Sequence, residues 1–163
     1  MAAVREGVRA DLSWLVGAVM RLNAAGTAAD PRFRFVADVE PILREHLGHV
    51  WFGRFQPFPA VWIAEVDGER VAMLSGEIVP DAGLLEQAPT ARIDNLWVEP
   101  PHRRAGLGRE LVAAFRARAE RAGYPGLQVS TLARDARAVA FWEAMGLSPL
   151  RVVLARDDGP EAP

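Results

Sequence analysis

Apolar residues in the first third of the chain recur at helical spacing after one short run that resembles a strand. Residues 3–8 predict the strand. Two helices are predicted after it, because apolar residues three and four positions apart share one helix face. Asp11 and Asp38 would cap these helices, since Asp is favoured at a helix N-terminus, and residues 23–34 would connect them. The apolar positions are Leu12, Leu15, Val16, Val19 and Leu22 in the first helix and Val39, Ile42, Leu43 and Leu47 in the second.

The middle of the chain has the pattern of a hairpin. Residues 61–66 (VWIAEV) and 71–79 (VAMLSGEIV) are apolar runs separated by the turn Asp67-Gly68-Glu69-Arg70. Asp-Gly between two such runs is among the strongest short-range indications of a hairpin. We therefore expect an antiparallel pair of strands, followed by a loop over residues 80–90.

The second half contains two units of a strand followed by a helix. Residues 91–98 (ARIDNLWV) predict a strand that ends before Pro100-Pro101, and a helix runs from about Leu107 to Arg121. The second unit is a strand at residues 127–131 and a helix between Asp135 and Gly146, with a last strand at residues 150–154. The order β-α-α-β-β-β-α-β-α-β predicts an α/β (α+β) fold with helices on the faces of a mixed sheet.

Length and composition are those of one globular domain. The chain has 163 residues, of which 50% are apolar and 25% are charged, enough for a single substantial core but not for two ordinary domains. We assign residues 1–156 to one domain and residues 157–163 to a flexible tail.

Charge and residue usage exclude several classes of function. A net charge of -2 gives no general attraction to nucleic acid, and the apolar runs are far shorter than the roughly 20 residues of a membrane span. The N-terminus lacks the basic and apolar regions of a signal peptide, so we expect a cytoplasmic location. The sequence contains neither Cys nor Lys, which excludes a cysteine nucleophile and a lysine Schiff base.

The segment after the predicted strand at residues 91–98 has the properties of an anion site. Gly106 and Gly108 would leave backbone N–H groups at a helix N-terminus open to a phosphate, because no Cβ blocks its approach. Arg103, Arg104 and Arg109 would add charge-assisted hydrogen bonds. A pyrophosphate fits these features, and so does an ordinary loop with solvated arginines. The nucleoside triphosphate motif G-x-x-x-x-G-K-[ST] and an early G-x-G-x-x-G are both absent.

Two motifs occur in order in this half of the chain. Arg103-x-x-Gly106-x-Gly108 follows a predicted strand and Pro100, and residues 135–147 read D-x-x-A-x-x-F-W-E-x-x-G-L. They resemble the R/Q-x-x-G-x-G/A and N-x-x-A-x-x-[LF]-[YW]-E-x-x-G-F patterns of the GNAT superfamily of N-acetyltransferases. The resemblance covers residues 91–154, and two motifs in the right order are more specific than either alone.

The resemblance implies the GNAT fold and a site for acetyl-CoA. That fold has a mixed sheet of about six strands flanked by about four helices, and a bulge splays two parallel strands, here those at residues 93–98 and 127–131. The pantetheine arm would bind the main chain of Leu96 and Val98 between these strands, with the pyrophosphate held by residues 103–109. The implied cofactor-binding residues are Leu96, Trp97, Val98, Arg103, Arg104, Ala105, Gly106, Leu107, Gly108, Arg109, Asp135, Ala138, Phe141 and Trp142.

Two positions depart from the family pattern. Asp135 stands where the family has Asn, and a carboxylate can accept a hydrogen bond but cannot donate an amide N–H. Trp142 stands where many members have a Tyr that acts as the acid, and an indole cannot supply that proton. Ser130, Thr131 or a water could protonate the thiolate instead, or the coenzyme could leave unprotonated. Tyr124, the only tyrosine, is expected to lie away from the thiol.

The general base has several candidates. Regular alternation on the strand at residues 93–98 would place Arg92, Asp94, Leu96 and Val98 on one face, where Asp94 could reach the acyl group directly or through water. The alternative is that Asp94 is a polar residue paired with Arg92 or a loop. Glu40, Glu45 and Glu77 are further candidates from the acceptor side.

Two other groups of residues have open interpretations. His46 and His49 are spaced to bind a metal from one helix face, but such a pair is more often a polar face, and we predict no metal site. The aromatic residues Trp51, Phe52, Phe55 and Phe58 could form an acceptor pocket, part of the core or a dimer surface.

The sequence therefore predicts an acetyl-CoA-dependent N-acetyltransferase whose acceptor is a primary amine. A small molecule is favoured as the acceptor over a protein N-terminus or lysine. The alternatives are an acetyl-CoA-binding sensor or structural module with little activity, and another phosphate-binding α/β protein. We expect neither nucleic acid nor membrane as a partner, and the strand at residues 150–154 could complete a sheet between two copies in a homodimer.

Overall fold

The strands form one mixed sheet that is antiparallel except at one edge. The computed structural model describes residues 2–53, 58, 60–79 and 88–155. In these residues the strand order is β1-β2-β3-β4-β5. Neighbouring strands are antiparallel from β1 to β4, and β4 and β5 are parallel. The strands are β1 (Ala2–Glu6), β2 (Val61–Val66), β3 (Glu69–Ile78), β4 (Thr90–Val98) and β5 (Gly126–Val129).

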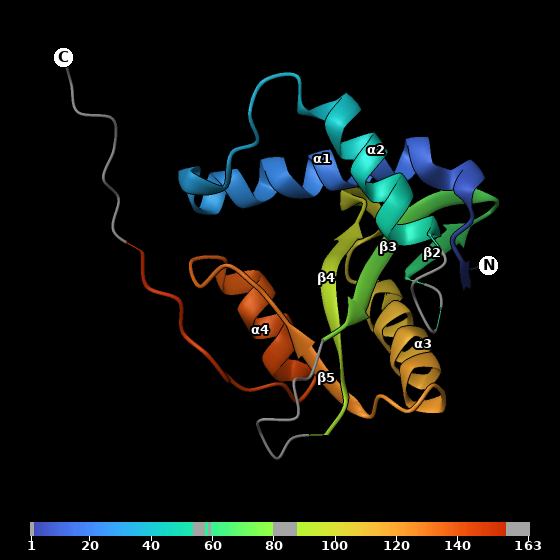
Figure 1. Ribbon diagram of the computed structural model, residues 1–163, viewed down its shortest axis with the longest axis vertical. Coiled ribbons are helices and arrows are strands. Elements are labelled where there is room, and N and C mark those ends of the chain that lie inside the picture. The colour runs from blue at the N-terminus through green and yellow to red at the C-terminus, as the bar shows by residue number, and fades with distance from the viewer. Residues whose placement is uncertain (1, 54–57, 59, 80–87, 156–163) are drawn as a thin grey trace.

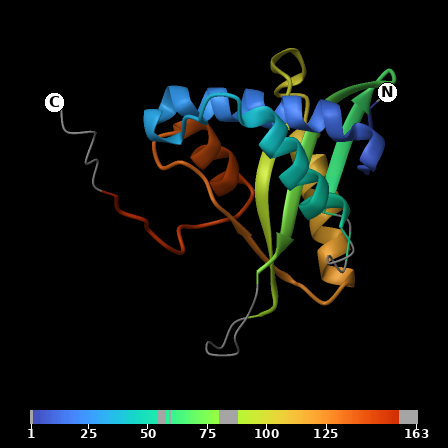
Figure 2. The same cartoon turned by 45° about the horizontal axis from the view of Figure 1, so that its top comes forward.

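Helices pack on both faces of this sheet. Figures 1 and 2 show α1 and α2 together on one face and α3 on the other, with α4 beside β5. The helices are α1 (Leu12–Ala29), α2 (Val39–Phe52), α3 (Leu107–Arg121) and α4 (Ala136–Ala144). Among the described residues, no helix has both the length and the apolar character needed to cross a membrane.

The alternation of side chains divides the core into two halves. On β2, Ile63 packs with α1 and α2, whereas Trp62 and Ala64 pack with α3, because successive residues of a strand point to opposite faces. Met73 and Trp97 belong to the first half, and Leu74 and Ile93 belong to the second. The predicted mixed sheet with helices on its faces is confirmed, with one strand fewer than the six expected.

Several predicted elements are confirmed by the local geometry. Asp67 and Gly68 both have positive φ angles, 51° and 83°, as a two-residue hairpin turn requires. Helix α3 has the predicted bounds, Leu107–Arg121. Asp135 caps α4, since its Oδ1 accepts a hydrogen bond from the Ala138 N–H at 3.1 Å.

Other predictions about elements are wrong. Asp11 and Asp38 immediately precede α1 and α2, but neither side chain accepts a hydrogen bond from the first turn of its helix. The Asp11 carboxylate instead binds two arginines, Arg5 and Arg70. Residues 150–154 form no strand, because in this chain they leave the sheet after α4. The predicted boundary after residue 156 and the tail at residues 157–163 lie outside the described residues.

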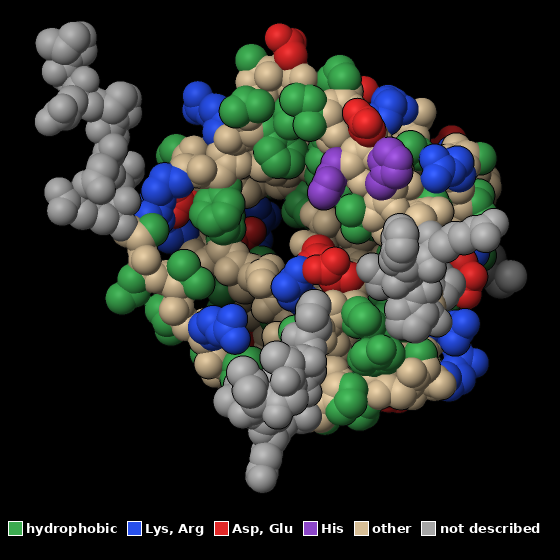
Figure 3. All heavy atoms as spheres, in the orientation of Figure 1, with side chains coloured by type: hydrophobic (Ala, Val, Ile, Leu, Met, Phe, Trp, Pro, Cys, Tyr) green, Lys and Arg blue, Asp and Glu red, His purple; other side chains and the backbone are tan. Residues whose placement is uncertain are grey.

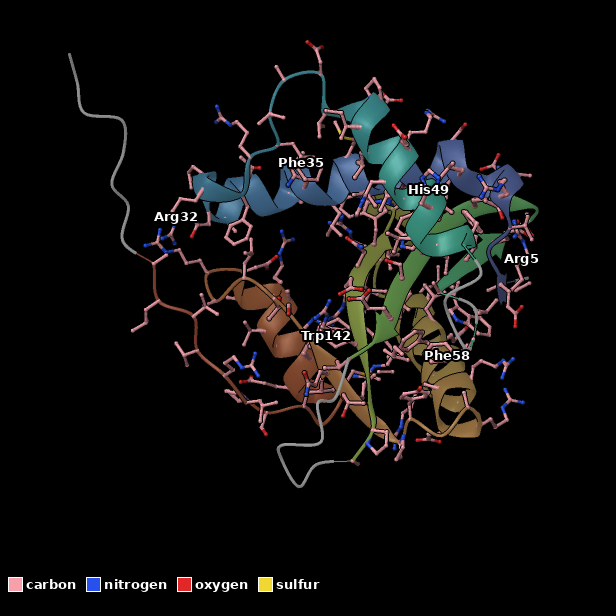
Figure 4. All side chains as sticks on the ribbon, in the orientation of Figure 1. Arg5, Arg32, Phe35, His49, Phe58 and Trp142 are labelled. Atoms are coloured by element: carbon pink, nitrogen blue, oxygen red, sulfur yellow. The ribbon has the colours of Figure 1, made fainter. Side chains whose placement is uncertain are left out.

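The aromatic residues before β2 do not form a single cluster. Trp51 packs in the core under α1 and α2, and Phe58 packs on the opposite face against Phe115 of α3 at 5.6 Å between ring centroids. Figure 4 shows Phe58 beside α3. Phe52 lies at the end of α2, with the Arg9 guanidinium 5.8 Å from its ring centre, and Phe55 lies outside the described residues. Trp51 and Phe58 are therefore core residues rather than one acceptor wall.

An ion-pair network around the buried Asp11 side chain ties β1 to the start of α1. The Asp11 side chain, only 1% exposed, accepts hydrogen bonds from Arg5 at 2.8 and 3.0 Å, from Arg70 Nε at 2.7 Å and from the Val8 N–H at 2.9 Å. Arg5 also donates to Glu65 of β2. The hydrogen bonds from Arg5, with those from Val8 and Arg70, hold the pKa of Asp11 well below its usual range.

We predict that Asp11→Asn lowers the free energy of unfolding by about 2 kcal/mol near pH 7, because the buried side chain loses its charge-assisted hydrogen bonds to Arg5 and Arg70, two guanidinium groups that are themselves partly exposed. A depressed pKa stabilises the fold above the ordinary Asp pKa of about 4, and this contribution is lost as the pH falls further. Urea unfolding from pH 7 to pH 3 should therefore show the wild type approaching the variant in stability.

Glu120→Gln is the matched control, since Glu120 makes an exposed pair with Arg116 four residues earlier on α3. Its effect should stay within about 0.5 kcal/mol. Equal stability of Asp11→Asn and the wild type at pH 7 would remove this network as a source of stability.

Candidate active site

A bulge in β4 interrupts the middle of the sheet. Ser75 of β3 lies opposite Asn95, and the next residue, Gly76, lies opposite Ile93, so that Asp94 has no partner on β3. The extra residue reverses the alternation of side chains. Ile93 packs in the α3 half of the core before the bulge, and Leu96 packs against the same half after it. The prediction that Arg92, Asp94, Leu96 and Val98 share one face is therefore wrong.

The bulge coincides with the end of the pairing between β4 and β5. The two strands pair from Thr90 with Gly126 to Ile93 with Val129. Within the described part of the chain, residues 94–98 of β4 have no strand partner on the side of β5. We call this side of residues 94–98 the open edge of β4. The predicted splayed pair of parallel strands is thus present, with Asp94 at the point where the strands part.

The open edge presents the main chain of Leu96 and Val98. The Glu99 N–H donates to the Val71 carbonyl of β3 at 2.8 Å. Because successive residues of an antiparallel strand direct their N–H and C=O groups to alternate sides, those of Val98 and Leu96 face away from β3. These are the two residues whose main chain the sequence resemblance assigns to the cofactor.

The loop at residues 103–108 presents the N-terminus of α3 beside this edge. Gly106 precedes α3 in the left-handed region with a φ of 88°, and no side chain caps the helix there. The first N–H groups of α3 are therefore open to an anion. A Cβ at Gly108 would lie 3.4 Å from the Phe141 ring and 3.8 Å from the Leu96 side chain, which places Gly108 between β4 and α4.

The arginines of this loop differ in their contacts. Arg103 donates from Nε to the Val98 carbonyl at 2.9 Å, and its guanidinium lies 4.7 Å from the centre of the Trp97 ring. Arg109 contacts the Met145 sulfur at 3.5 Å. The exposed residues of this loop and the start of α3 include Arg103, Arg104, Ala105 and Arg109. The Leu107 side chain, in contrast, is buried in the core. The Trp97 side chain packs under α1, so it supports Arg103 rather than the open edge.

Helix α4 supplies the other wall of this region. The Phe141 ring contacts the Trp142 ring edge-on, with 4.9 Å between their centres, and Trp142 is buried in the α3 half of the core. Figure 4 shows Trp142 on the side of α4 that faces the sheet. Ala138 is half-buried on α4, and an Asp135 oxygen is used to cap the helix. Tyr124 does not belong to this wall. Its ring packs against the Phe58 ring on the face of the sheet that α3 covers, with 6.0 Å between the ring centres.

A charged cluster lies at the bulge. Arg92 donates from Nε to Asp94 at 2.7 Å and from Nη2 to Glu77 of β3. The hydrogen bond to Asp94, together with the charges of both carboxylates, raises the pKa of Arg92 above its ordinary value. One guanidinium and two carboxylates give this cluster a formal charge of -1. Figure 3 shows acidic and basic side chains together beside a hollow in the middle of the view, where Figure 1 places β3 and β4.

The remaining candidates lie on α2. Glu40 of α2 is not part of the charged cluster in which Arg92 joins Glu77 and Asp94. It pairs instead with Arg44 at 3.0 Å, and Arg44 also donates to the Ser13 hydroxyl of α1. His49 Nδ1 lies 3.0 Å from the Glu45 carbonyl, and the histidines form the purple patch over α2 in Figure 3. Among the described residues, no group of three His, Asp or Glu side chains is placed to hold a metal.

Two features of the site were missed by the sequence reasoning. Asn95 donates to the buried Ser75 hydroxyl at 2.8 Å, which fixes the pairing after the bulge. A Cβ at Gly76 would lie 2.3 Å from the Arg92 carbonyl and 2.6 Å from the Phe115 ring, so only glycine fits there. A glycine inside a strand indicates a bulge or a close backbone approach. Gly76, in the middle of the predicted strand at residues 71–79, could therefore have indicated the bulge from the sequence.

Comparisons with known proteins agree on one family and fold. A sequence model of the Acetyltransferase (GNAT) family matches residues 27–147. A search of curated proteins finds no significant match. The likeness to solved structures extends over nearly the whole chain but at low identity, so it establishes the fold alone.

Three solved structures illustrate this likeness. Aminoglycoside N-acetyltransferase AAC(6')-Iy in complex with CoA is 17% identical, with a TM-score of 0.72 over 98% of this chain and 96% of that chain. A mutant of the BH1408 protein from Bacillus halodurans is 17% identical, with a TM-score of 0.80 over 94% and 98%. An aminoglycoside acetyltransferase from an uncultured soil metagenomic sample, in complex with sisomicin, is 18% identical, with a TM-score of 0.69 over 95% and 93%.

We predict that Gly76→Ala lowers the free energy of unfolding by about 3 kcal/mol, because the new methyl group would overlap the Arg92 carbonyl and the Phe115 ring. Thermal unfolding monitored by circular dichroism would measure the loss.

Gly17→Ala provides the comparison for Gly76→Ala, since a Cβ at Gly17 would approach only the flexible end of Arg21. In the interior of α1 this change should stabilise by roughly 0.5–1 kcal/mol. A Gly76→Ala protein as stable as the wild type would show that the bulge does not depend on this close approach.

Proposed function

We propose that this chain, which belongs to the GNAT family of acetyltransferases, transfers the acetyl group of acetyl-CoA to a primary amine of a small molecule. Family membership makes the chain an N-acetyltransferase, and acetyl-CoA is the usual cosubstrate of the family. The observation that carries the proposal is the open edge of β4, which lies between an uncapped helix N-terminus and a charged cluster at the bulge.

The residues present fit the cosubstrate. The uncapped N–H groups at the start of α3 suit a pyrophosphate, and Arg103, Arg104 and Arg109 add positive charge beside them. The amide groups of a pantetheine arm need donors and acceptors in a row, as the open edge supplies at Leu96 and Val98. Arg103 would exchange its hydrogen bond with the Val98 carbonyl for a phosphate oxygen.

Acetyl-CoA supplies an acyl group on a thioester, which a neutral amine can attack directly without a covalent enzyme intermediate. A main-chain N–H of the open edge, at Leu96 or Val98, is suited to donate to the oxygen that becomes negative during the attack. The donor is fixed by the sheet before the substrate binds, because Trp97 pairs with Met73 on the other side of β4. Little reorganisation is then needed during the reaction.

The charged cluster is suited to the acceptor amine. Its formal charge of -1 favours an ammonium group, and its position at the bulge is where the open edge begins. We assign Asp94 as the base that accepts the proton of the amine, directly or through water, with Arg92 holding its orientation. Glu77 is the second carboxylate of the same cluster, whereas the pairing of Glu40 with Arg44 argues against a direct role for Glu40.

The proton for the leaving thiolate does not come from an aromatic hydroxyl in this chain. Trp142 is buried and its indole is no acid, and Tyr124 is packed against Phe58. Ser130 and Thr131 are exposed just after β5. A thiol pKa near 8.5 also allows the thiolate to leave and take its proton from solvent.

The choice of a small-molecule acceptor is supported by two observations. The cluster combines both signs of charge over a few residues of β3 and β4, which suits a compact polar amine rather than an extended chain. Structural neighbours named as aminoglycoside acetyltransferases make aminoglycosides the first compounds to try.

We predict that the protein releases free thiol from acetyl-CoA when it is given a suitable amine from a panel of aminoglycosides, polyamines and aromatic amines. The release should rise with pH as the amine loses its proton. Binding of acetyl-CoA by calorimetry with no turnover over the whole panel, including N-terminal and lysine peptides, would instead indicate a sensor.

Gly108→Trp and Ala140→Trp serve as the paired controls for this assay. An indole at Gly108 would fill the space toward Phe141 and Leu96, so this variant should lose both acetyl-CoA binding and thiol release. Ala140 is exposed on α4, and its variant should keep both. Undiminished acetyl-CoA affinity in a folded Gly108→Trp protein would exclude the proposed cofactor site.

We predict that Asp94→Asn lowers kcat by about a hundredfold, the usual contribution of a general base, while acetyl-CoA affinity changes less than twofold. The pH profile should also flatten, because the group that accepts the proton is gone. Glu120→Gln, which removes an exposed ion pair with Arg116 on α3, should leave kcat unchanged. A full rate at every pH in Asp94→Asn would remove Asp94 from the mechanism and leave Glu77 as the carboxylate to test.

A further inference from the structure

A pair of polar residues follows the apolar core on the face of the sheet that α1 and α2 cover. Met73 and Trp97, which lie opposite each other on β3 and β4, belong to that half of the core. The next residues on this face, Ser75 and Asn95, are polar and also lie opposite each other. The charged cluster at the bulge comes directly after them, beside the hollow in Figure 3. Asn95 therefore lies between the apolar core and the charged cluster.

Only one end of the Asn95 amide has a partner. Its Nδ2 donates to the hydroxyl of the buried Ser75 at 2.8 Å. Because the nitrogen and the oxygen diverge from one carbon, this hydrogen bond turns Oδ1 away from β3, toward the side of the open edge. Among the described residues, no donor binds that oxygen. The half-buried Asn95 can therefore accept a hydrogen bond from a ligand at this point of the strand.

Asp94 provides a second acceptor on the same face. Ile93 and Leu96 both pack toward the α3 half of the core, so the two residues between them lie on the other face, as a bulge allows. Arg92 donates to Oδ1 of Asp94 at 2.7 Å. Its other oxygen, Oδ2, is left for a further donor. Two acceptors on consecutive residues, one charged and one neutral, thus face the hollow.

We propose that Asn95 makes the enzyme specific for primary amines, by accepting one of the two N–H groups of the neutral amine while Asp94 accepts the other. This inference rests on the proposed function. With both N–H groups held, the lone pair of the nitrogen is left to point at the thioester. A secondary amine has a single N–H in its neutral form, so it cannot bind both oxygens.

The same two contacts account for the proton. The lone pair of the amine forms the C–N bond, and the electron pair of the carbonyl moves to its oxygen. Asp94 then takes the proton of the N–H group that it holds. The C–S bond breaks with its electrons on sulfur. Asn95 takes no proton, so it is a residue that determines specificity and not a second base.

The test compares two substrates in the wild type and in Asn95→Leu. They are the primary amine of the acceptor panel with the highest kcat/KM and the same compound with one methyl group on the acetylated nitrogen. Leucine keeps the branched shape of asparagine without an acceptor. The ratio of the two kcat/KM values should fall about fivefold in Asn95→Leu, because one hydrogen bond is lost with the primary amine and none with its methyl derivative.

Ser75→Ala is the matched control, since it breaks the same hydrogen bond between the strands but keeps the Asn95 oxygen. It should change the ratio by less than about twofold. The double variant Ser75→Ala/Asn95→Leu replaces both polar partners, and it takes the place of Asn95→Leu if the buried hydroxyl left alone prevents folding. It should show the same fall in the ratio.

A purely structural role of Asn95 would slow both amines equally, so an unchanged ratio in the folded variant overturns the proposal. A fall in Ser75→Ala as large as in Asn95→Leu overturns it as well, because the ratio would then follow strand register. A wild type that acetylates no amine of the panel overturns the proposed function and this inference with it. Turnover with an unchanged ratio overturns this inference alone.

Discussion

The bulge at Asp94 is the constraint on which the rest of the site depends. The extra residue of β4 falls between Ile93 and Asn95, which lie opposite Gly76 and Ser75 of β3, and the approach of the Arg92 carbonyl to Gly76 leaves no room for a Cβ. The same irregularity ends the pairing with β5 and leaves the main chain of Leu96 and Val98 open. A regular strand would have satisfied those groups with hydrogen bonds to β5. The binding of an extended polar arm that we propose for this site therefore depends on strand register rather than on any reactive side chain.

The bulge also separates two kinds of chemistry on the two faces of the sheet. Because it reverses the alternation, Leu96 faces α3 and α4, while Arg92, before the bulge, lies with Glu77 away from the α3 half of the core. Asp94, the extra residue, is held by Arg92 at the point of reversal. The loop at residues 103–108 and the charged cluster are thus reached from different directions, with the main chain of β4 between them. Such an arrangement allows a thioester and an amine to approach one main-chain donor from opposite sides.

Periodicity and turn chemistry predicted the elements of the fold but not the irregularities that make the site. The hairpin followed from Asp67-Gly68, and α3 and the cap of α4 followed from local patterns that need no tertiary information. The bulge could not be read from alternation, since one inserted residue only shifts the phase of the pattern. Asp11 was assigned as a cap because its partners, Arg5 and Arg70, are distant in the sequence. The motif at residues 103–108 could be identified because it consists of consecutive residues, whereas the link between Glu77 and Asp94 through Arg92 depends on strand register.

The width of the splay depends on how firmly β5 is held. β5 is bound to the sheet through its pairing with residues 90–93 of β4, and no strand of the described residues pairs with its other edge. The open edge of β4 remains accessible only if β5 does not slide along β4 to close it. A Cβ at Gly126 would overlap the Thr90 side chain, so the strands are closely packed at the paired end and fixed there.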